Sequence, residues 1–150
     1  MVRFVHASDL HLDTPLGGLM DAEEDLARFF HSATFQAWDN IVDLCLERAV
    51  DFLLLAGDMY DGEDRSLKAQ LAFRDGLMRL AEEGIPAFVV HGNHDPLDSW
   101  ASTISWPELA HFFGAKVESV PYMKDGKQQA IIHGVSFPQR DVKTNLANLF

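Results

Sequence analysis

Three apolar stretches in the first two thirds of the chain each end in a polar turn. They cover residues 2–8, 52–56 and 87–90, and each is followed by acidic, amide or imidazole side chains. Short apolar runs of this kind are typical of strands in a parallel sheet that is covered on both faces. We therefore predict three buried strands whose carboxyl ends carry polar residues.

Apolar residues recur at helical spacing between the first two predicted strands. Phe35, Trp38, Val42, Cys45 and Ala49 lie three or four residues apart, so they share one face of a helix. This stripe predicts a helix that packs on the sheet.

A second helix is predicted over residues 64–83. Ser66 is a suitable N-cap residue, and Gly84 is a suitable residue to end the helix. Gly76 is expected to weaken it slightly, because glycine has a low helix propensity. The residues predicted to face the core are Leu67, Leu71, Met78 and Ala81.

The order strand, helix, strand, helix, strand predicts an α/β protein with right-handed crossovers between parallel strands. In such a sheet the three polar turns lie along one edge. Open α/β sheets bind their ligands at this carboxyl edge.

The pattern changes in the last third of the chain. A short helix is predicted over residues 106–113, and strands over 116–120 and 128–136. A turn at Asp125-Gly126 predicts that these two strands form a hairpin. Residues 145–150 are expected to begin a helical segment.

Acidic residues dominate the first part of the chain. The net charge of the 150 residues is -11; residues 1–64 hold 14 acids and 3 bases, and residues 65–150 hold 9 of each. A domain with this charge has no general attraction for a phosphate backbone, which normally depends on Lys and Arg. A polyanionic substrate would therefore need bound cations, a local basic patch or a basic partner.

Membrane and export signals are absent from the sequence pattern. No apolar run approaches the roughly 20 residues that span a bilayer, and the amino terminus lacks the apolar region of a signal peptide. The single cysteine, Cys45, excludes an internal disulfide and fits a reducing compartment. We therefore expect a cytoplasmic protein without a membrane partner.

The three polar turns together suggest a metal centre. Asp9 and His11 are one residue apart, so in an extended chain both side chains leave the same face. Their nitrogen and oxygen donors suit Mn, Fe or Zn better than Ca or Mg. Asp58 can bridge two ions, and Asn93 can bind the second ion through its amide oxygen. Alone, each turn could equally be a polar turn without function.

The residues after Asn93 suggest acid–base chemistry beside these ions. His94 is placed to stabilise charge on a phosphoryl group or to protonate the leaving oxygen. Asp95 would orient His94 or its loop. Asp61 could reach the same crevice. The combination predicts a two-metal centre for phosphoryl transfer, with His94 and Asp95 in the catalytic group.

Asp9-Leu-His11, Gly57-Asp58 and Gly92-Asn93-His94-Asp95 resemble the motifs of the calcineurin-like metallophosphoesterases. Residues 4–13 and 56–61 further resemble the SbcD/YhaO-type DNA repair exonucleases. The resemblance implies a four-layer α/β/β/α sandwich and cleavage of DNA phosphodiesters with two divalent ions, Mn first among them. It also implies an SMC-like ATPase partner and leaves a homodimer open.

One departure from the family pattern concerns later histidines. The family continues with a further single His and a Gly-His-x-His, whereas after Asp95 this chain contains only His111 and His133. We therefore expect residues 1–150 to be the amino-terminal portion of one truncated nuclease domain that is weakly active or inactive alone. His133 could substitute as a ligand, although a histidine within a strand is more often a packing residue.

Two other functions stay open at this stage. The same fold could serve a small-molecule phosphodiesterase or a phosphomonoesterase, which the net charge of -11 favours over unaided DNA binding. It could also be a non-catalytic scaffold, as the missing histidines would suggest.

Overall fold

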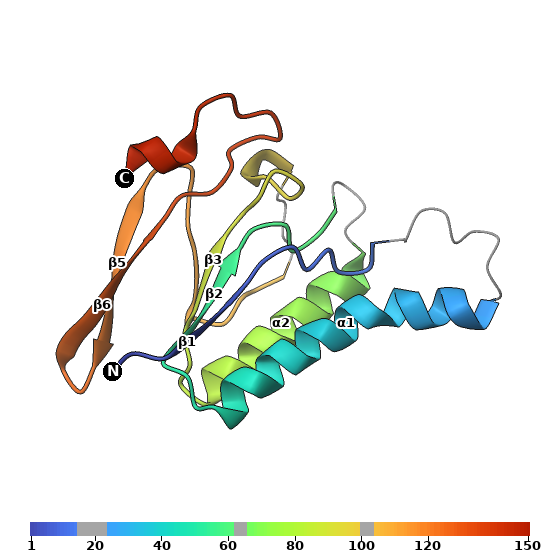
Figure 1. Ribbon diagram of the computed structural model, residues 1–150, viewed down its shortest axis with the longest axis horizontal. Coiled ribbons are helices and arrows are strands. Elements are labelled where there is room, and N and C mark those ends of the chain that lie inside the picture. Colours follow the sequence, from blue (N-terminus) through green and yellow to red (C-terminus); the bar gives the residue numbers. More distant parts are fainter. Residues whose placement is uncertain (15–23, 62–65, 100–103) are drawn as a thin grey trace.

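A four-stranded parallel sheet separates two long helices from an antiparallel hairpin (Figure 1). This computed structural model describes residues 1–14, 24–61, 66–99 and 104–150, without the side chains of residues 24–31. The sheet has the order β1-β2-β3-β4. Its strands are β1 (Phe4–Ala7), β2 (Phe52–Ala56), β3 (Ala87–Val90) and β4 (Ala110–Phe112). The α/β prediction is confirmed.

Side chains alternate across the sheet and so create two cores. Leu53 and Leu55 of β2 pack toward α1 (Glu24–Glu47) and α2 (Leu67–Glu82). Phe52 packs on the opposite face against the hairpin of β5 (Glu118–Lys124) and β6 (Lys127–Gly134). This alternation follows from the two-residue period of a strand. Two 3₁₀ turns complete the described elements, η1 (Leu97–Ser99) and η2 (Leu146–Leu149).

The strand β1 is less buried than the sequence suggests. It is shorter than the predicted 2–8, and its residues are exposed or half-buried, with Phe4 51% exposed. The reason is its place at one edge of the sheet, with β2 as its strand neighbour. An apolar run does not distinguish an edge strand from a central one.

The predicted helix over residues 106–113 is wrong. Ala110–Phe112 instead form β4, which pairs in parallel with β3 through Ala87↔Ala110 and Val89↔Phe112. Ala110 and Phe112 pack on the helix side, and Phe113 packs on the hairpin side. A three-residue strand is too short to show its period in the sequence.

The predicted buried face of α2 is also wrong in part. Leu67 and Met78 are 61% and 43% exposed. The buried residues are Ala69, Phe73, Gly76, Leu77 and Leu80. The predicted N-cap is confirmed, since the Ser66 hydroxyl accepts a hydrogen bond from Ala69 N at 2.9 Å.

Gly76 explains why the two helices pack on that face. A Cβ at this position would lie 2.4 Å from Nε1 of Trp38, which is fully buried on α1. The Trp38 indole donates to the Ala72 carbonyl at 3.1 Å and packs on Phe73 at 5.0 Å between ring centroids. The glycine that weakens the helix is therefore the residue that admits the tryptophan.

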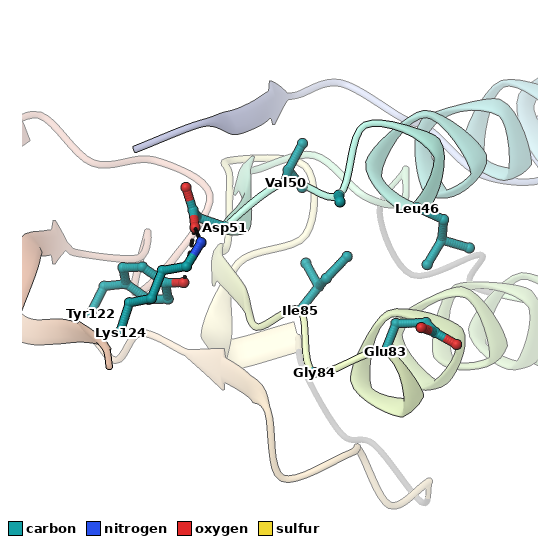
Figure 2. Close-up of a pocket in the computed structure, with 9 residues that line it drawn as sticks. Leu46, Val50, Asp51, Glu83, Gly84, Ile85, Tyr122 and Lys124 are labelled. Carbon is teal, nitrogen blue, oxygen red and sulfur yellow. Dashed lines mark hydrogen bonds and ion pairs between the residues drawn. The ribbon is translucent and has the colours of Figure 1, made fainter. Parts of the chain in front are cut away.

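Asp51 links the hairpin to the edge of the sheet where the parallel strands begin (Figure 2). Its carboxylate accepts hydrogen bonds from Lys124 Nζ at 2.5 Å, Tyr122 Oη at 3.3 Å and Arg3 N at 2.7 Å. The hydrogen bond from Lys124, followed by the one from Arg3 N, holds the pKa of Asp51 below its usual value. These side chains border a cavity of about 420 Å³ whose apolar wall includes Val50 and Ile85.

Among the described residues, no helix is both long and apolar enough to cross a bilayer. Cys45 is buried without a disulfide partner, and burial raises the pKa of its thiol to about 11. Cys45 is thus a core residue, as its place on the apolar stripe of α1 predicts.

We predict that Gly76→Ala destabilises the protein, although alanine is the better helix former. The added methyl group meets the Trp38 ring, and overpacking of this kind costs about 1–3 kcal/mol. Thermal or urea unfolding measures the effect. Glu82→Ala on the exposed side of α2 is the control and should change stability by less than about 0.5 kcal/mol. A Gly76→Ala variant as stable as this control would contradict the prediction.

Candidate metal centre

The first two polar turns run side by side beyond the ends of β1 and β2. Asp9 N donates to Gly57 O at 3.1 Å, His11 N to Asp58 O at 3.1 Å, and Leu12 N to Met59 O at 2.9 Å. The pairing of the two strands therefore continues into the turns. It brings the side chains of Asp9, His11 and Asp58 to one edge of the sheet.

These three residues have left-handed backbone conformations. Their φ angles are 56° for Asp9, 42° for His11 and 55° for Asp58. The expectation that Asp9 and His11 extend from one face of a straight chain is therefore wrong in its geometry. Such conformations are uncommon outside glycine and cluster at functional sites, where the surrounding structure holds them.

Glycine allows the second and third turns to touch. A Cβ on Gly57 would lie 2.9 Å from the Gly92 Cα, and a Cβ on Gly92 would lie 2.1 Å from Oδ1 of Asp58. Gly57 also has a φ of 85°. No other residue type fits this contact, which presses the turn after β3 against the Asp58 carboxylate.

Two overlapping groups of side chains are arranged to hold a metal ion. In the first group, Asp9, His11 and Asp58 each offer one ligand atom, and these atoms lie within 4.8 Å of one another. This is the set that the sequence predicts around one ion. Its imidazole and carboxylate donors suit a divalent ion such as Mn, Fe or Zn.

The second group joins His11 to Asp61 and His94 under the same distance limit. His94 Nδ1 lies 2.7 Å from Asp61 Oδ1, and the His94 and His11 rings meet edge to face at 5.2 Å between centroids. Since the hydrogen bond engages Nδ1, it leaves Nε2 of His94 available at the site. This geometry suits a histidine that acts on a substrate.

The third turn is bound to the second through its backbone. His94 N donates to Asp58 Oδ1 at 2.9 Å. Asn93, the predicted ligand of a second ion, is half-buried between Gly92 and His94 in this turn. The structure thus brings the segment of Asn93 and His94 against Asp58, as the predicted centre requires.

Asp95 lies beneath the turns and belongs to neither candidate metal-binding group. It is fully buried, and its carboxylate accepts hydrogen bonds from Gly92 N at 2.7 Å, Asp58 N at 3.1 Å and Met59 N at 3.1 Å. Burial, which outweighs these hydrogen bonds, raises the pKa of Asp95 to about 6. Of the two tasks expected of Asp95, this geometry fits the orientation of the loop, whereas the side chain bonded to His94 is Asp61.

The other described histidines lie outside both metal-binding groups. His91 is buried and its Nδ1 lies 3.0 Å from the Asp95 carbonyl oxygen. His133 lies on β6 beside Ser119 Oγ at 2.8 Å, and His111 lies 3.2 Å from Glu118. Neither of the two groups found among the described residues includes His111 or His133.

Two structural partners were not identified from the sequence. The sequence predicts only that Asp61 could reach the crevice, and nothing in its motif indicates a hydrogen bond to His94. Ser136 is fully buried; its hydroxyl accepts from His91 N at 2.9 Å and donates to Phe113 O at 2.6 Å. Ser136 therefore joins the end of β3 to the end of β4.

Comparison with known proteins identifies similar sequences over nearly the whole chain. Residues 2–144 match the family described as calcineurin-like phosphoesterase. The chain is 40% identical over 147 residues to the uncharacterized metallophosphoesterase YhaO of Bacillus subtilis, covering 97% of this chain and 36% of that protein. It is 34% identical over 91 residues to the DNA double-strand break repair protein Mre11 of Thermoplasma acidophilum, covering 61% of this chain and 22% of the relative.

A second Mre11 is matched along the chain. The protein of Sulfurisphaera tokodaii is 26% identical over 147 residues, covering 98% of this chain and 36% of the relative. The chain thus spans about a third or less of the length of these curated relatives.

We predict that Gly92→Ala disrupts the metal centre as well as the fold. The methyl group would meet the Asp58 carboxylate and backbone, so the turn must move away from Asp58, at a cost of about 1–3 kcal/mol. Thermal unfolding and calorimetric titration with Mn²⁺ measure both effects.

Gly114→Ala is the matched control for this variant. Among the described residues, the one atom within 4 Å of its Cβ would be Oε1 of Glu118, at 3.0 Å. A flexible side chain can adjust to that contact. If Gly92→Ala bound Mn²⁺ as Gly114→Ala does, the contact between the turns would not matter for the centre.

Proposed function

Because the chain belongs to the calcineurin-like phosphoesterase family, we propose that it contributes to a metal-dependent hydrolase that cleaves phosphodiester bonds in DNA. The single observation that supports the chemistry most is the joint placement of Asp9, His11 and Asp58 beside the His94–Asp61 pair. Relatives named for DNA double-strand break repair support DNA as the substrate. An exonuclease within DNA repair is the specific activity that we propose for the complete protein.

We propose that Asp9, His11, Asp58 and Asn93 hold two divalent ions. Mn²⁺ is the first choice, with Fe or Zn as alternatives, because the donors combine imidazole nitrogen with carboxylate and amide oxygen. Ions of this kind polarise phosphoryl oxygens and supply a nucleophile at neutral pH by lowering the pKa of water. Asp58 contacts the turn of Asn93 and His94, and it is the residue that we propose would bind both ions.

His94 is proposed to deliver a proton to the leaving oxygen of the substrate. Its Nδ1 is held by Asp61 at 2.7 Å, which fixes the orientation of the ring. Nε2 is then the atom that faces the substrate. Because a sugar alkoxide is a poor leaving group, its protonation contributes about 10²–10⁴-fold to the rate in comparable sites.

Asp95 is proposed to act as a positioning residue. It holds the amides of Asp58, Met59 and Gly92, and these amides belong to the two turns that carry the ligands. Its buried carboxylate would keep these turns at a fixed separation. Asp95 thereby affects the reaction through Asp58 and Asn93 rather than through contact with the substrate.

The resemblance to SbcD-type nucleases supports an SMC-like ATPase partner and allows a homodimer. The buried, unpaired Cys45 fits a reducing cytoplasm. A second candidate function, hydrolysis of small phosphodiesters or monoesters, is favoured by the net charge of -11. Comparing Mn-dependent cleavage of linear DNA, an aryl phosphodiester and an aryl phosphomonoester separates these functions.

We predict that Asp58→Asn and His94→Ala both abolish most DNA cleavage, for different reasons. In the complete natural polypeptide, His94→Ala should lower the rate by about 10²–10⁴-fold and retain Mn²⁺ binding. Asp58→Asn should weaken Mn²⁺ binding by more than the roughly 10–100-fold that is typical when a residue hydrogen-bonded to a metal ligand is replaced. Nuclease assays and calorimetry measure these effects, with His111→Gln and Asp75→Asn as controls. Full nuclease activity in either site variant would refute the assigned roles.

We predict that Asp61→Asn affects substrates according to their leaving group. Cleavage of DNA, which releases a sugar hydroxyl, should fall by at least about tenfold, because His94 loses the partner that orients it. Cleavage of an aryl diester that releases nitrophenolate should fall much less, since that group leaves without a proton. An equal loss on both substrates together with weaker Mn²⁺ binding would show instead that Asp61 is a metal ligand.

A further inference from the structure

The acidic charge of this chain raises the question of how it could attract DNA. The net charge is -11, whereas DNA binding depends on neutralisation of phosphates by Lys and Arg. Bound ions at the centre would offset part of this charge, at one point only. A nuclease that contains this chain therefore needs bases close to the centre. This requirement rests on the proposed function.

Bases outnumber acids at the end of the sequence. Residues 113–150 contain five bases and three acids, in contrast to residues 1–64, with three bases and 14 acids. Two of the five, Lys124 and Lys127, flank the turn of the β5–β6 hairpin. Lys124 binds Asp51 at the amino end of β2, so this turn lies at the edge opposite the metal centre.

The segment that follows β6 returns to the edge of the metal centre. Phe137 N donates to His91 O at 3.0 Å, and Leu97 N donates to Phe137 O at 3.0 Å. Asp98 N then donates to Pro138 O at 3.2 Å. These hydrogen bonds attach the segment on both sides of the turn that carries Asn93 and His94. In Figure 1 this segment, in red, runs at the same end of the molecule as η1.

Arg140 and Lys143 follow directly after this attachment. Both are exposed, and neither makes a side-chain hydrogen bond or ion pair within the part of the chain that the structure describes. Several other bases are engaged: Arg74 with Asp75, Arg79 with Asp43, and Lys124 with Asp51. The two cations nearest along the chain to the attached segment are thus free for a ligand.

We propose that Arg140 and Lys143 bind backbone phosphates of DNA that flank the bond to be cleaved. The metal-binding residues lie beyond β1 and β2, and the segment of Arg140 and Lys143 is attached beyond β3. The nucleic acid strand would therefore cross the carboxyl edge of the sheet in the direction from β1 toward β4. The two bases would supply positive charge next to the turn that carries Asn93 and His94.

The test compares DNA binding by four variants of the complete natural polypeptide. Each variant carries His94→Ala, so that Mn²⁺ stays bound while DNA is cleaved about 10²–10⁴-fold more slowly than by the unmodified protein. The variants are this background alone, Arg140→Ala with Lys143→Ala, Lys127→Ala as an exposed base at the opposite edge, and Asp141→Asn. The Kd for a duplex oligonucleotide is measured at several salt concentrations.

The proposal gives a different result for each variant. Loss of two phosphate contacts should weaken binding and lower the slope of log affinity against log salt by about 1.8. Lys127→Ala should leave the slope unchanged, and Asp141→Asn should strengthen binding because it removes the acid between the two bases. A fifth variant, Arg140→Lys with Lys143 unchanged, keeps both charges and should show the same slope as the His94→Ala background.

Two failures can be told apart. If the double variant showed the same salt slope as Lys127→Ala while the unmodified protein cleaved DNA, the proposed phosphate contacts would be wrong. If the unmodified protein cleaved neither DNA nor an aryl phosphodiester with Mn²⁺, the proposed function itself would fail. Circular dichroism of each variant checks that these surface substitutions leave the fold unchanged.

Discussion

The arrangement of the centre depends on the close approach of two backbone turns. Gly57 and Gly92 lie so near each other that a side chain on either would displace its neighbour. Asp95 completes the contact from below, because its carboxylate accepts hydrogen bonds from amides of both turns. The position of Asp58, and with it the spacing of the ligands, follows from this contact.

The same constraint explains where the molecule tolerates unfavourable conformations. Asp9, His11 and Asp58 all have positive φ angles, which non-glycine residues rarely adopt. Backbone hydrogen bonds to Gly57 and Asp58 hold the first two in place. The packing of the sheet stabilises these unfavourable conformations, and the fold thereby brings the ligand atoms together. This pre-organisation is what a centre of fixed spacing requires.

The two edges of the sheet perform different tasks. At the amino-terminal edge, Asp51 joins β1, β2 and the hairpin through three hydrogen bonds, a structural contact. At the carboxyl edge, side chains from three successive turns come together in the two candidate metal-binding groups. Ser136 and Phe137 connect this edge to the segment after β6. That segment extends the surface proposed to contact DNA beyond the candidate metal ligands.

The sequence by itself determined the long elements and the residues at the strand ends, because periodicity and turn residues are local signals. Asp9, His11 and Asp58 could thus be selected as candidate ligands, and in the structure their ligand atoms lie within 4.8 Å of one another. The strand β4, the buried face of α2 and the Asp61–His94 bond were decided only by tertiary structure. Ala69 and Gly76 carry no strong apolar signal, yet both are buried, and the small size of Gly76 admits Trp38. Likewise, Asp61 reaches His94 only because the turns after β2 and β3 are pressed together, a distance that no local pattern encodes.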